Sequence, residues 1–405
     1  MSGSGRSFRR GTRITLIACL ATLGIPAPAL ADESSAQPAD RAYVVAQSGG
    51  VATIDLFSDG SVQRNAPLFP TGSGTFGITA SPDRRHLYVA PGTGLGTASD
   101  PTQKPQLVTI RVGSAGQLQP VGQPLDLAAG LTPVSAAFSH DGRDLYLGVG
   151  NIVAGFVNGA VLHFRIGDDG TPVQQGGPVA LGLPLDGAAE PIVSPDGKSL
   201  YVASYLASSI VRFAIQPDGS LSGKPVDRVT GVSTPITPAV SPDGRFLYIA
   251  DEQSQSITAF RIRPDDSLEP VPGSPFPTGA IPHNFVFSSD GKHLYSANTA
   301  GASPAGLLTG DGSVSAFDVR DDGSLAPLPG SPYRTLAGPI MVNRSTDGRW
   351  LYVTSSRQLV GDKKVMFSSY PIRPDGTVDT SAAHSVETGQ QTADGPEAVV
   401  LPATS

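Results

Sequence analysis

Cysteine, tryptophan and charged side chains are scarce in this chain of 405 residues. It has one cysteine and one tryptophan, and charged residues make up 16% of it. The single cysteine, Cys19, lies in an N-terminal segment that we expect to be removed. The remaining chain then lacks a disulfide, a thiolate nucleophile and a cysteine metal ligand. The scarcity of good helix formers also disfavours long helices and coiled coils.

Basic clusters and long apolar runs are missing as well. The net charge is −7, and removal of the N-terminal segment takes away four arginines and no acidic residue, which makes the chain more acidic. Nucleic-acid binding needs clustered Lys and Arg to meet the phosphates, so we expect no such partner. No run reaches the roughly 18 apolar residues of a membrane span, so we expect no membrane-spanning segment.

The N-terminus has the pattern of a secretory signal peptide. Four arginines precede a mostly apolar run over 14–23, and Ala29-Leu30-Ala31 supplies the small-x-small pattern of a cleavage site. The pattern predicts a signal peptide over 1–31 that is cleaved after Ala31, followed by a short linker over 32–40. We therefore expect a secreted or otherwise extracytoplasmic protein.

A second interpretation of the same segment is lipidation. Leu16-Ile17-Ala18-Cys19 resembles a lipoprotein attachment box. Only two residues separate Arg13 from this box, which is short for the apolar region of such a signal. Cleavage after Ala31 is the favoured prediction, with lipidation of Cys19 as the alternative.

Glycine and proline, by contrast, are abundant. The chain has 48 glycines and 37 prolines, together about a fifth of its residues and roughly twice their average usage. A hydrophobic content of 39% is high enough for a folded core. This composition is typical of many short strands joined by tight turns.

A repeat of about 53 residues runs through the chain. Its core is Ser81-Pro82-Asp83-Arg84-Arg85-His86-Leu87-Tyr88-Val89-Ala90, and variants such as SPDGRFLYIA recur at similar intervals. Six copies at a near-constant spacing indicate one repeated structural unit. The turn aspartates of the six copies are Asp83, Asp141, Asp196, Asp243, Asp290 and Asp347.

Each repeat predicts a four-stranded antiparallel sheet. An apolar strand precedes the Asp-Gly turn, Leu-Tyr-Val-Ala follows as a second strand, and an alternating third strand ends at a second turn such as Asp218-Gly219. The second turn occurs seven times, from Asp59-Gly60 to Asp375-Gly376, against six copies of the first. The missing first strand is supplied by the C-terminal run Pro396 to Leu401, which matches the start of the preceding unit.

The fold class expected from this count is all-β, a seven-bladed β-propeller. The C-terminal strand completes the N-terminal blade, and this closure removes the free sheet edges. We expect a single propeller domain over 41–405 and a monomer.

The blade sequences resemble the lactonase family of seven-bladed β-propellers, which includes 6-phosphogluconolactonase. The resemblance rests on Ser241-Pro242-Asp243-Gly244-Arg245-Phe246-Leu247-Tyr248 and on the Pro-Gly-Ser-Pro stretches that begin at Pro272 and Pro329. Tyr352-Val353-Thr354-Ser355 is similar to the Tyr-Val-Thr-Asn repeat of related exported propellers. The resemblance implies this fold and, as an expected activity, hydrolysis of a small sugar lactone. Family members tend to carry Pro-His-x-His, whereas Pro282-His283-Asn284-Phe285 keeps only the first histidine.

Small-molecule sites of propellers lie at the end of the ring where the inner strands begin, which we call the mouth. Alignment of the repeats places one histidine and two glutamates there, in a mostly apolar ring. His283 is the candidate base that activates water, and Glu190 is the second candidate catalytic residue. Asn284 and Thr237 are candidate donors to a developing oxyanion. Other candidate ligand-binding residues are Glu397 and Asn298.

Two functions remain open at this stage. One is a lactonase, a hydrolase of a small cyclic ester at the mouth, and the other is a non-catalytic exported binding or interaction module. In the second case His283 bonds a neighbouring turn and the glutamates are solvated. Three long loops, Pro91 to Pro105, Thr299 to Gly312 and Ser355 to Lys364, suit binding in either case.

Metal and cofactor motifs are absent from the sequence. No His-x-His or His-Glu-x-x-His spacing occurs, and paired acids such as Asp168-Asp169 lack the spacing of a calcium loop. Gly92, Gly94 and Gly96 are not followed by a predicted helix, so they do not form a phosphate loop. We expect no metal and no cofactor, and a small molecule as the partner.

Overall fold

The computed structural model describes residues 37–75, 77–92, 104–151, 157–187, 189–356, 363–392 and 397–403. Residues 37–405 form one compact unit, which begins a few residues before the expected domain start at 41. The predicted signal peptide, most of the linker, the alternative lipidation site Cys19, and most of two of the long loops lie outside the described residues. No helix in the described part of the chain is long and apolar enough to span a bilayer.

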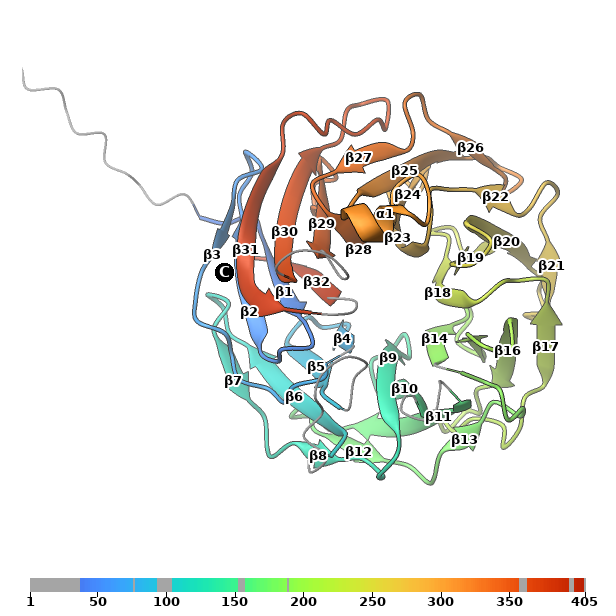
Figure 1. The fold of residues 1–405 in the computed structure, drawn as a ribbon. Coiled ribbons are helices and arrows are strands. Elements are labelled where there is room, and N and C mark those ends of the chain that lie inside the picture. Colours follow the sequence, from blue (N-terminus) through green and yellow to red (C-terminus); the bar gives the residue numbers. More distant parts are fainter. Residues whose placement is uncertain are drawn as a thin grey trace, which may run out of the picture. The chain divides into compact units, whose positions relative to one another are not determined.

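The described residues form seven antiparallel sheets arranged as the blades of a ring, and the inner strand of each blade faces the centre (Figure 1). This confirms the predicted seven-bladed propeller. From the inner strand outward, blade 1 consists of β32 (Glu397–Pro402), β1 (Asp40–Val45), β2 (Val51–Leu56) and β3 (Val62–Arg64). Blade 2 consists of β4 (Gly77–Ala80), β5 (His86–Ala90), β6 (Gln106–Val112), β7 (Leu118–Pro120) and β8 (Leu125–Asp126), and blade 3 of β9 (Thr132–Phe138), β10 (Asp144–Asn151), β11 (Val157–Ile166), β12 (Pro172–Gln174) and β13 (Val179–Ala180). Blade 4 consists of β14 (Ala189–Val193), β15 (Ser199–Ser204), β16 (Ser209–Ala214) and β17 (Asp227–Thr230).

The remaining three blades follow the same order. Blade 5 consists of β18 (Pro235–Val240), β19 (Phe246–Asp251), β20 (Ser256–Ile262), β21 (Leu268–Pro270) and β22 (Phe276–Pro277). Blade 6 consists of β23 (Pro282–Phe287), β24 (His293–Asn298), β25 (Gly312–Val319), β26 (Leu325–Pro327) and β27 (Tyr333–Thr335), with the short helix α1 (Gly306–Thr309) between β24 and β25. Blade 7 consists of β28 (Gly338–Arg344), β29 (Trp350–Ser356), β30 (Lys364–Pro371) and β31 (His384–Gln391).

The ring closes through the C-terminal strand, as predicted. β32 pairs antiparallel with β1 over six residue pairs, from Asp40 opposite Pro402 to Val45 opposite Glu397. Blade 1 therefore combines residues from both ends of the chain. Without β32, β1 would be left as the unpaired inner strand of blade 1, so the closure gives this blade the same inner strand that the other six have.

The repeated Ser-x-Asp-Gly sequence forms a hydrogen-bonded loop rather than a two-residue hairpin turn. In the loop from Ser241, the glycine N–H donates to the serine carbonyl, and the serine hydroxyl donates to Asp243 at 2.6 Å. The same aspartate accepts from the N–H of Arg245 at 3.0 Å, and the serine Oγ accepts from the N–H of Phe246 at 3.0 Å. These bonds explain why serine and aspartate recur at fixed positions in all six copies.

The hydrophobic core lies between the blades. Each apolar cluster joins facing sides of two neighbouring sheets; in one of them Phe246 and Tyr248 of blade 5 pack against Phe285 and Phe287 of blade 6. The repeated tyrosine also bridges the blades, because its hydroxyl donates to the second-turn carbonyl of the next blade, as Tyr248 does to Gly323 at 2.8 Å. Five junctions show this bond, from Tyr88, Tyr146, Tyr201, Tyr248 and Tyr295.

At six of the seven junctions a side chain at the start of the second strand lies against a glycine of the next blade, and at five of them this side chain is large. At Gly323 an added Cβ would lie 2.4 Å from the ring of Phe246, and at Gly170 it would lie 2.6 Å from His86. One junction is different, because Ser199 replaces the large side chain and Asp266 replaces the glycine. Asp266 is 6% exposed with a φ of 60°, so the aspartate side chain occupies this junction instead.

Candidate functional site

The mouth is formed where the seven inner strands begin. Around the ring, each inner strand contacts the next, from β4 through β9, β14, β18, β23 and β28 to β32 and back to β4. Polar side chains join several of these strands, since the Thr237 hydroxyl donates to the His283 carbonyl at 2.7 Å. Side chains from separate blades therefore converge on one small area, as a site for a small molecule requires.

His283 faces a carboxylate from the neighbouring blade. Its Nε2 lies 3.9 Å from Oε1 of Glu252, and both side chains are 18% exposed. The other carboxylate oxygen of Glu252 accepts a hydrogen bond of 2.6 Å from the hydroxyl of Tyr205 in blade 4. Blades 4, 5 and 6 thus each contribute one member of a row that runs Tyr205, Glu252, His283.

Glu190, at the start of β14 in blade 4, belongs to the same group. Its burial raises the pKa of its carboxyl to about 8, the negative charge of Glu252 raises it further, and a hydrogen bond with Thr237 opposes both effects. A carboxyl with this pKa is mostly protonated at pH 7 and can donate a proton.

The loop that carries Glu252 is held in place by the buried carboxyl group of Asp251. Asp251, next to Glu252, is 1% exposed, accepts from the Ser233 N–H at 3.1 Å and is also bonded by the Thr258 hydroxyl. Burial raises the pKa of Asp251 to about 6. These bonds to the last residue of β19 hold the backbone from which Glu252 projects.

The other predicted ligand-binding residues serve mainly as links in the fold. Asn284 Oδ1 accepts from the N–H of Val342 at 3.0 Å, and Glu397 Oε2 accepts from the N–H of Ile78 at 3.2 Å. Both bonds join neighbouring inner strands. Asn298 is fully buried, and its Nδ2 donates to Ser313 and Ser315 within blade 6, at 3.1 and 2.9 Å.

Sequence reasoning therefore brought His283, Glu190 and Thr237 together but missed Glu252 and Tyr205. The inner strands were aligned to find the mouth, whereas both missed residues follow the second strands of their blades. A signal was present, because Asp251-Glu252 directly follows Leu247-Tyr248-Ile249-Ala250 at the mouth end of that strand. Within the described residues, no three His, Cys, Asp or Glu side chains are grouped closely enough to hold a metal ion.

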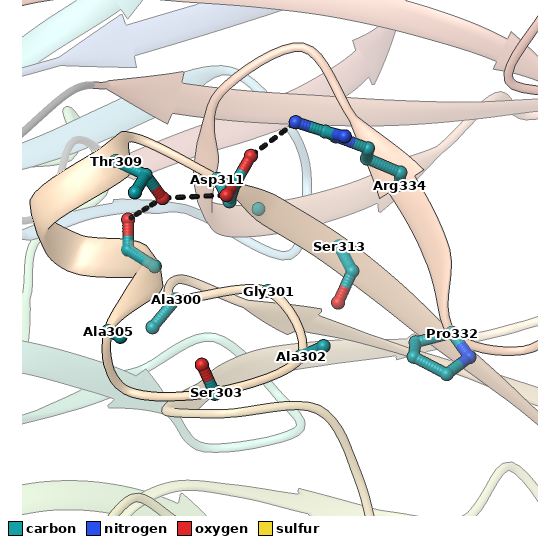
Figure 2. Close-up of a pocket in the computed structure, with 12 residues that line it drawn as sticks. Ala300, Gly301, Ala302, Ser303, Ala305, Thr309, Asp311, Ser313, Pro332 and Arg334 are labelled. Atoms are coloured by element: carbon teal, nitrogen blue, oxygen red, sulfur yellow. Dashed lines mark hydrogen bonds and ion pairs between the residues drawn. The ribbon is translucent and has the colours of Figure 1, made fainter.

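A separate pocket of about 370 Å³ lies in blade 6 beneath the loop that follows β24 (Figure 2). The loop is one of the long loops noted in the sequence, and α1 forms within it. Thr309 donates to Asp311 at 2.6 Å, and Asp311 is ion-paired with Arg334. Alanine, glycine and hydroxyl side chains make up most of the remaining lining, so this pocket lacks an available base.

Comparison with known proteins agrees with this architecture. The family model described as "Lactonase, 7-bladed beta-propeller" matches residues 171–269. A periplasmic gluconolactonase from Pseudomonas aeruginosa superposes with a TM-score of 0.67 at 21% identity, over 89% of this chain and 99% of that one. A putative 6-phosphogluconolactonase from Bacteroides uniformis superposes with a TM-score of 0.66 at 18% identity, over 89% and 100% of the two chains.

The identities are low, so these structures establish the fold alone. A search of curated protein sequences found no match. The matched segment 171–269 includes part of the mouth, namely Glu190, Thr237 and Glu252. The chain is a seven-bladed β-propeller that resembles the lactonase family.

Proposed function

We propose that this protein hydrolyses a small lactone with an uncharged ring, such as a sugar lactone, at its mouth. The observation that carries the proposal is the convergence of His283, Glu252 and Glu190 from three blades. A base beside a carboxylate and a neutral carboxyl acid are the two groups that opening of a cyclic ester requires.

In this mechanism His283 is the general base. With Nε2 turned toward Glu252, a proton on Nε2 leaves Nδ1 as the basic nitrogen. The imidazole takes a proton from water as the water oxygen bonds to the lactone carbonyl carbon. The carboxylate of Glu252, oriented by the Tyr205 hydroxyl, stabilises the imidazolium that forms.

Glu190 is the general acid of the second step. The ring C–O bond breaks as the tetrahedral intermediate collapses, and the departing alkoxide takes the proton of Glu190. The product is the open-chain hydroxy acid, and solvent returns the proton from His283 to Glu190. A pKa of about 8 keeps this carboxyl protonated at neutral pH, which a solvated glutamate is not.

The test is hydrolysis of glucono-lactones by the purified protein, measured through the protons that the reaction releases. We expect His283→Ala and Glu252→Gln to lower kcat by about 100-fold or more, because general base catalysis contributes that much. His384→Ala is the matched control, since His384 is exposed on the outer strand of blade 7. Full activity of His283→Ala would exclude the assignment. Absence of turnover on every lactone, together with binding at the mouth, would establish the alternative binding module.

We also propose that the protein is exported. The sequence pattern before Ala31 supports this, and mass spectrometry of the extracytoplasmic protein should find a chain that begins near Asp32. A lipid on Cys19 would replace this proposal with attachment to a membrane surface.

A further inference from the structure

A second pocket, of about 420 Å³, lies between blades 1 and 2 on the face opposite the mouth. Its position follows from topology, because the loops that end the inner strands lie at the other end of the ring from where those strands begin. Three arginines line it, Arg41 from β1 and Arg84 and Arg85 from the loop before β5, together with Tyr43 and Asp83. This is an unusual concentration of positive charge in a chain with a net charge of −7.

Arg84 departs from the repeat at a position where a side chain is disfavoured. In the five other copies of this loop the residue is glycine, with φ values between 71° and 76°. Arg84 adopts the same left-handed conformation, with a φ of 62°, and its N–H makes the same hydrogen bond to the serine carbonyl at 2.8 Å. Arg84 therefore occupies a left-handed position that carries a conformational penalty for a side chain, and strained positions of this kind are enriched at functional sites.

Arg85 departs in its pairing. The basic residue at this position in the other five copies forms an ion pair with the aspartate of its own loop, as Arg245 does with Asp243 at 2.6 Å. The full set of such pairs is Arg143–Asp141, Lys198–Asp196, Arg245–Asp243, Lys292–Asp290 and Arg349–Asp347. Within the part of the chain that the structure describes, neither Arg84 nor Arg85 makes an ion pair.

Arg41 is the buried member of the group. Its side chain is 9% exposed, and its Nε donates to Asp55 at 2.8 Å, which orients the guanidinium and leaves both Nη groups for other acceptors. The pocket and its immediate partners therefore combine three guanidinium groups with two carboxylates, Asp83 and Asp55. Asp83 is engaged by the Ser81 hydroxyl and by the N–H of Arg85.

We propose that this pocket binds an oxyanion, specifically the phosphate or sulfate group of a small organic molecule. Guanidinium groups match the geometry of such oxyanions. The corresponding pocket between blades 6 and 7 is lined by Asp290, His293, Arg349 and Arg373. Both of its arginines are ion-paired, Arg349 with Asp347 and Arg373 with Asp379, whereas Arg84 and Arg85 are not paired among the described residues. A volume of about 420 Å³ leaves room for an organic group beside the oxyanion.

The experiment is titration of the full chain with inorganic phosphate, sulfate, glucose 6-phosphate and glucose at constant ionic strength, followed by calorimetry. We expect phosphate and sulfate to bind, glucose 6-phosphate to bind more tightly, and glucose not to bind. Arg84→Gly restores the residue of the five sister loops, so the variant should fold, and it should weaken phosphate binding about 10-fold.

Arg143→Ala is the matched control, because Arg143 takes the place of Arg85 in the next blade and is paired with its own aspartate. This variant should bind phosphate as the parent chain does. Arg85→Ala should weaken binding about as much as Arg84→Gly. Absence of phosphate and sulfate binding, or unchanged binding in Arg84→Gly, would overturn the proposal. Lactone hydrolysis is not measured here, so the result is independent of the proposed function of the mouth.

Discussion

The junction between blades 4 and 5 offers a direct test of how this ring is packed. Five junctions place a large side chain against a turn glycine and a sixth places Asp144 there, whereas here Ser199 faces Asp266. We predict that exchanging the pair for the Phe246 and Gly323 arrangement of the next junction preserves the fold. The perturbation is a cycle of Ser199→Phe, Asp266→Gly and the double variant.

The magnitudes follow from the contacts. Ser199→Phe alone places a ring where the side chain of Asp266 lies, since even a Cβ at the equivalent Gly323 would be 2.4 Å from the ring of Phe246. Such overpacking costs about 1–3 kcal/mol. Asp266→Gly alone relieves a left-handed backbone but empties the junction, so we expect a change within about 1 kcal/mol. In the double variant the ring fills that space, which contributes about 1.5–3 kcal/mol of apolar burial.

The assay is urea unfolding of all four proteins at pH 7. We expect a favourable coupling free energy of about 2 kcal/mol or more between the two substitutions. A coupling near zero would refute the idea that Asp266 stands in for a large side chain on the preceding blade. Burial raises the pKa of Asp266. The charged form of Asp266 therefore destabilises the fold at pH values above the ordinary pKa of an aspartate. The benefit of Asp266→Gly should therefore be larger at pH 7 than at pH 4.

Three further predictions test other parts of the ring. Tyr248→Phe should lower the free energy of unfolding by about 1–2 kcal/mol in urea denaturation, because the buried carbonyl of Gly323 loses its donor. Deletion of residues 397–405 should lower stability by several kcal/mol by calorimetry, since β1 loses its partner strand; an unchanged melting temperature would contradict the closure. The pKa of Glu190 rises on folding to about 8, so the free energy of unfolding should fall as the pH rises from about 4.5 to 8. Glu190→Gln should remove this part of the pH dependence, as measured by urea unfolding at both pH values.

The sequence was sufficient for the architecture because the repeat carries it. The Ser-x-Asp-Gly loop, the buried tyrosine and the second turn each recur with their own hydrogen bonds, and the surplus second turn predicted the closing strand correctly. Such features are local or involve the nearest blade, and a single alignment of the copies therefore recovers them.

The candidate site was recovered only in part, for a geometric reason. Alignment identifies which residues share a level of the ring, and this placed His283 and Glu190 at the mouth. It does not show which side chains of neighbouring blades meet, so Glu252 and Tyr205 were missed. Asn298, which the sequence offered as a ligand-binding candidate, ends a strand whose alternation turns its side chain into blade 6, toward Ser315.

Departures from the repeat carry the remaining information, but each needs the structure to interpret it. Asp266 in place of glycine is balanced by Ser199 across the junction, so it has a packing explanation. Arg84 in place of glycine has no such balance, because it is exposed and makes no ion pair among the described residues. The two substitutions look alike in the sequence, since each removes a glycine from a left-handed position. The neighbouring blade distinguishes the two substitutions. Asp266 fills the space left by Ser199, whereas Arg84 lines an open pocket together with Arg41 and Arg85.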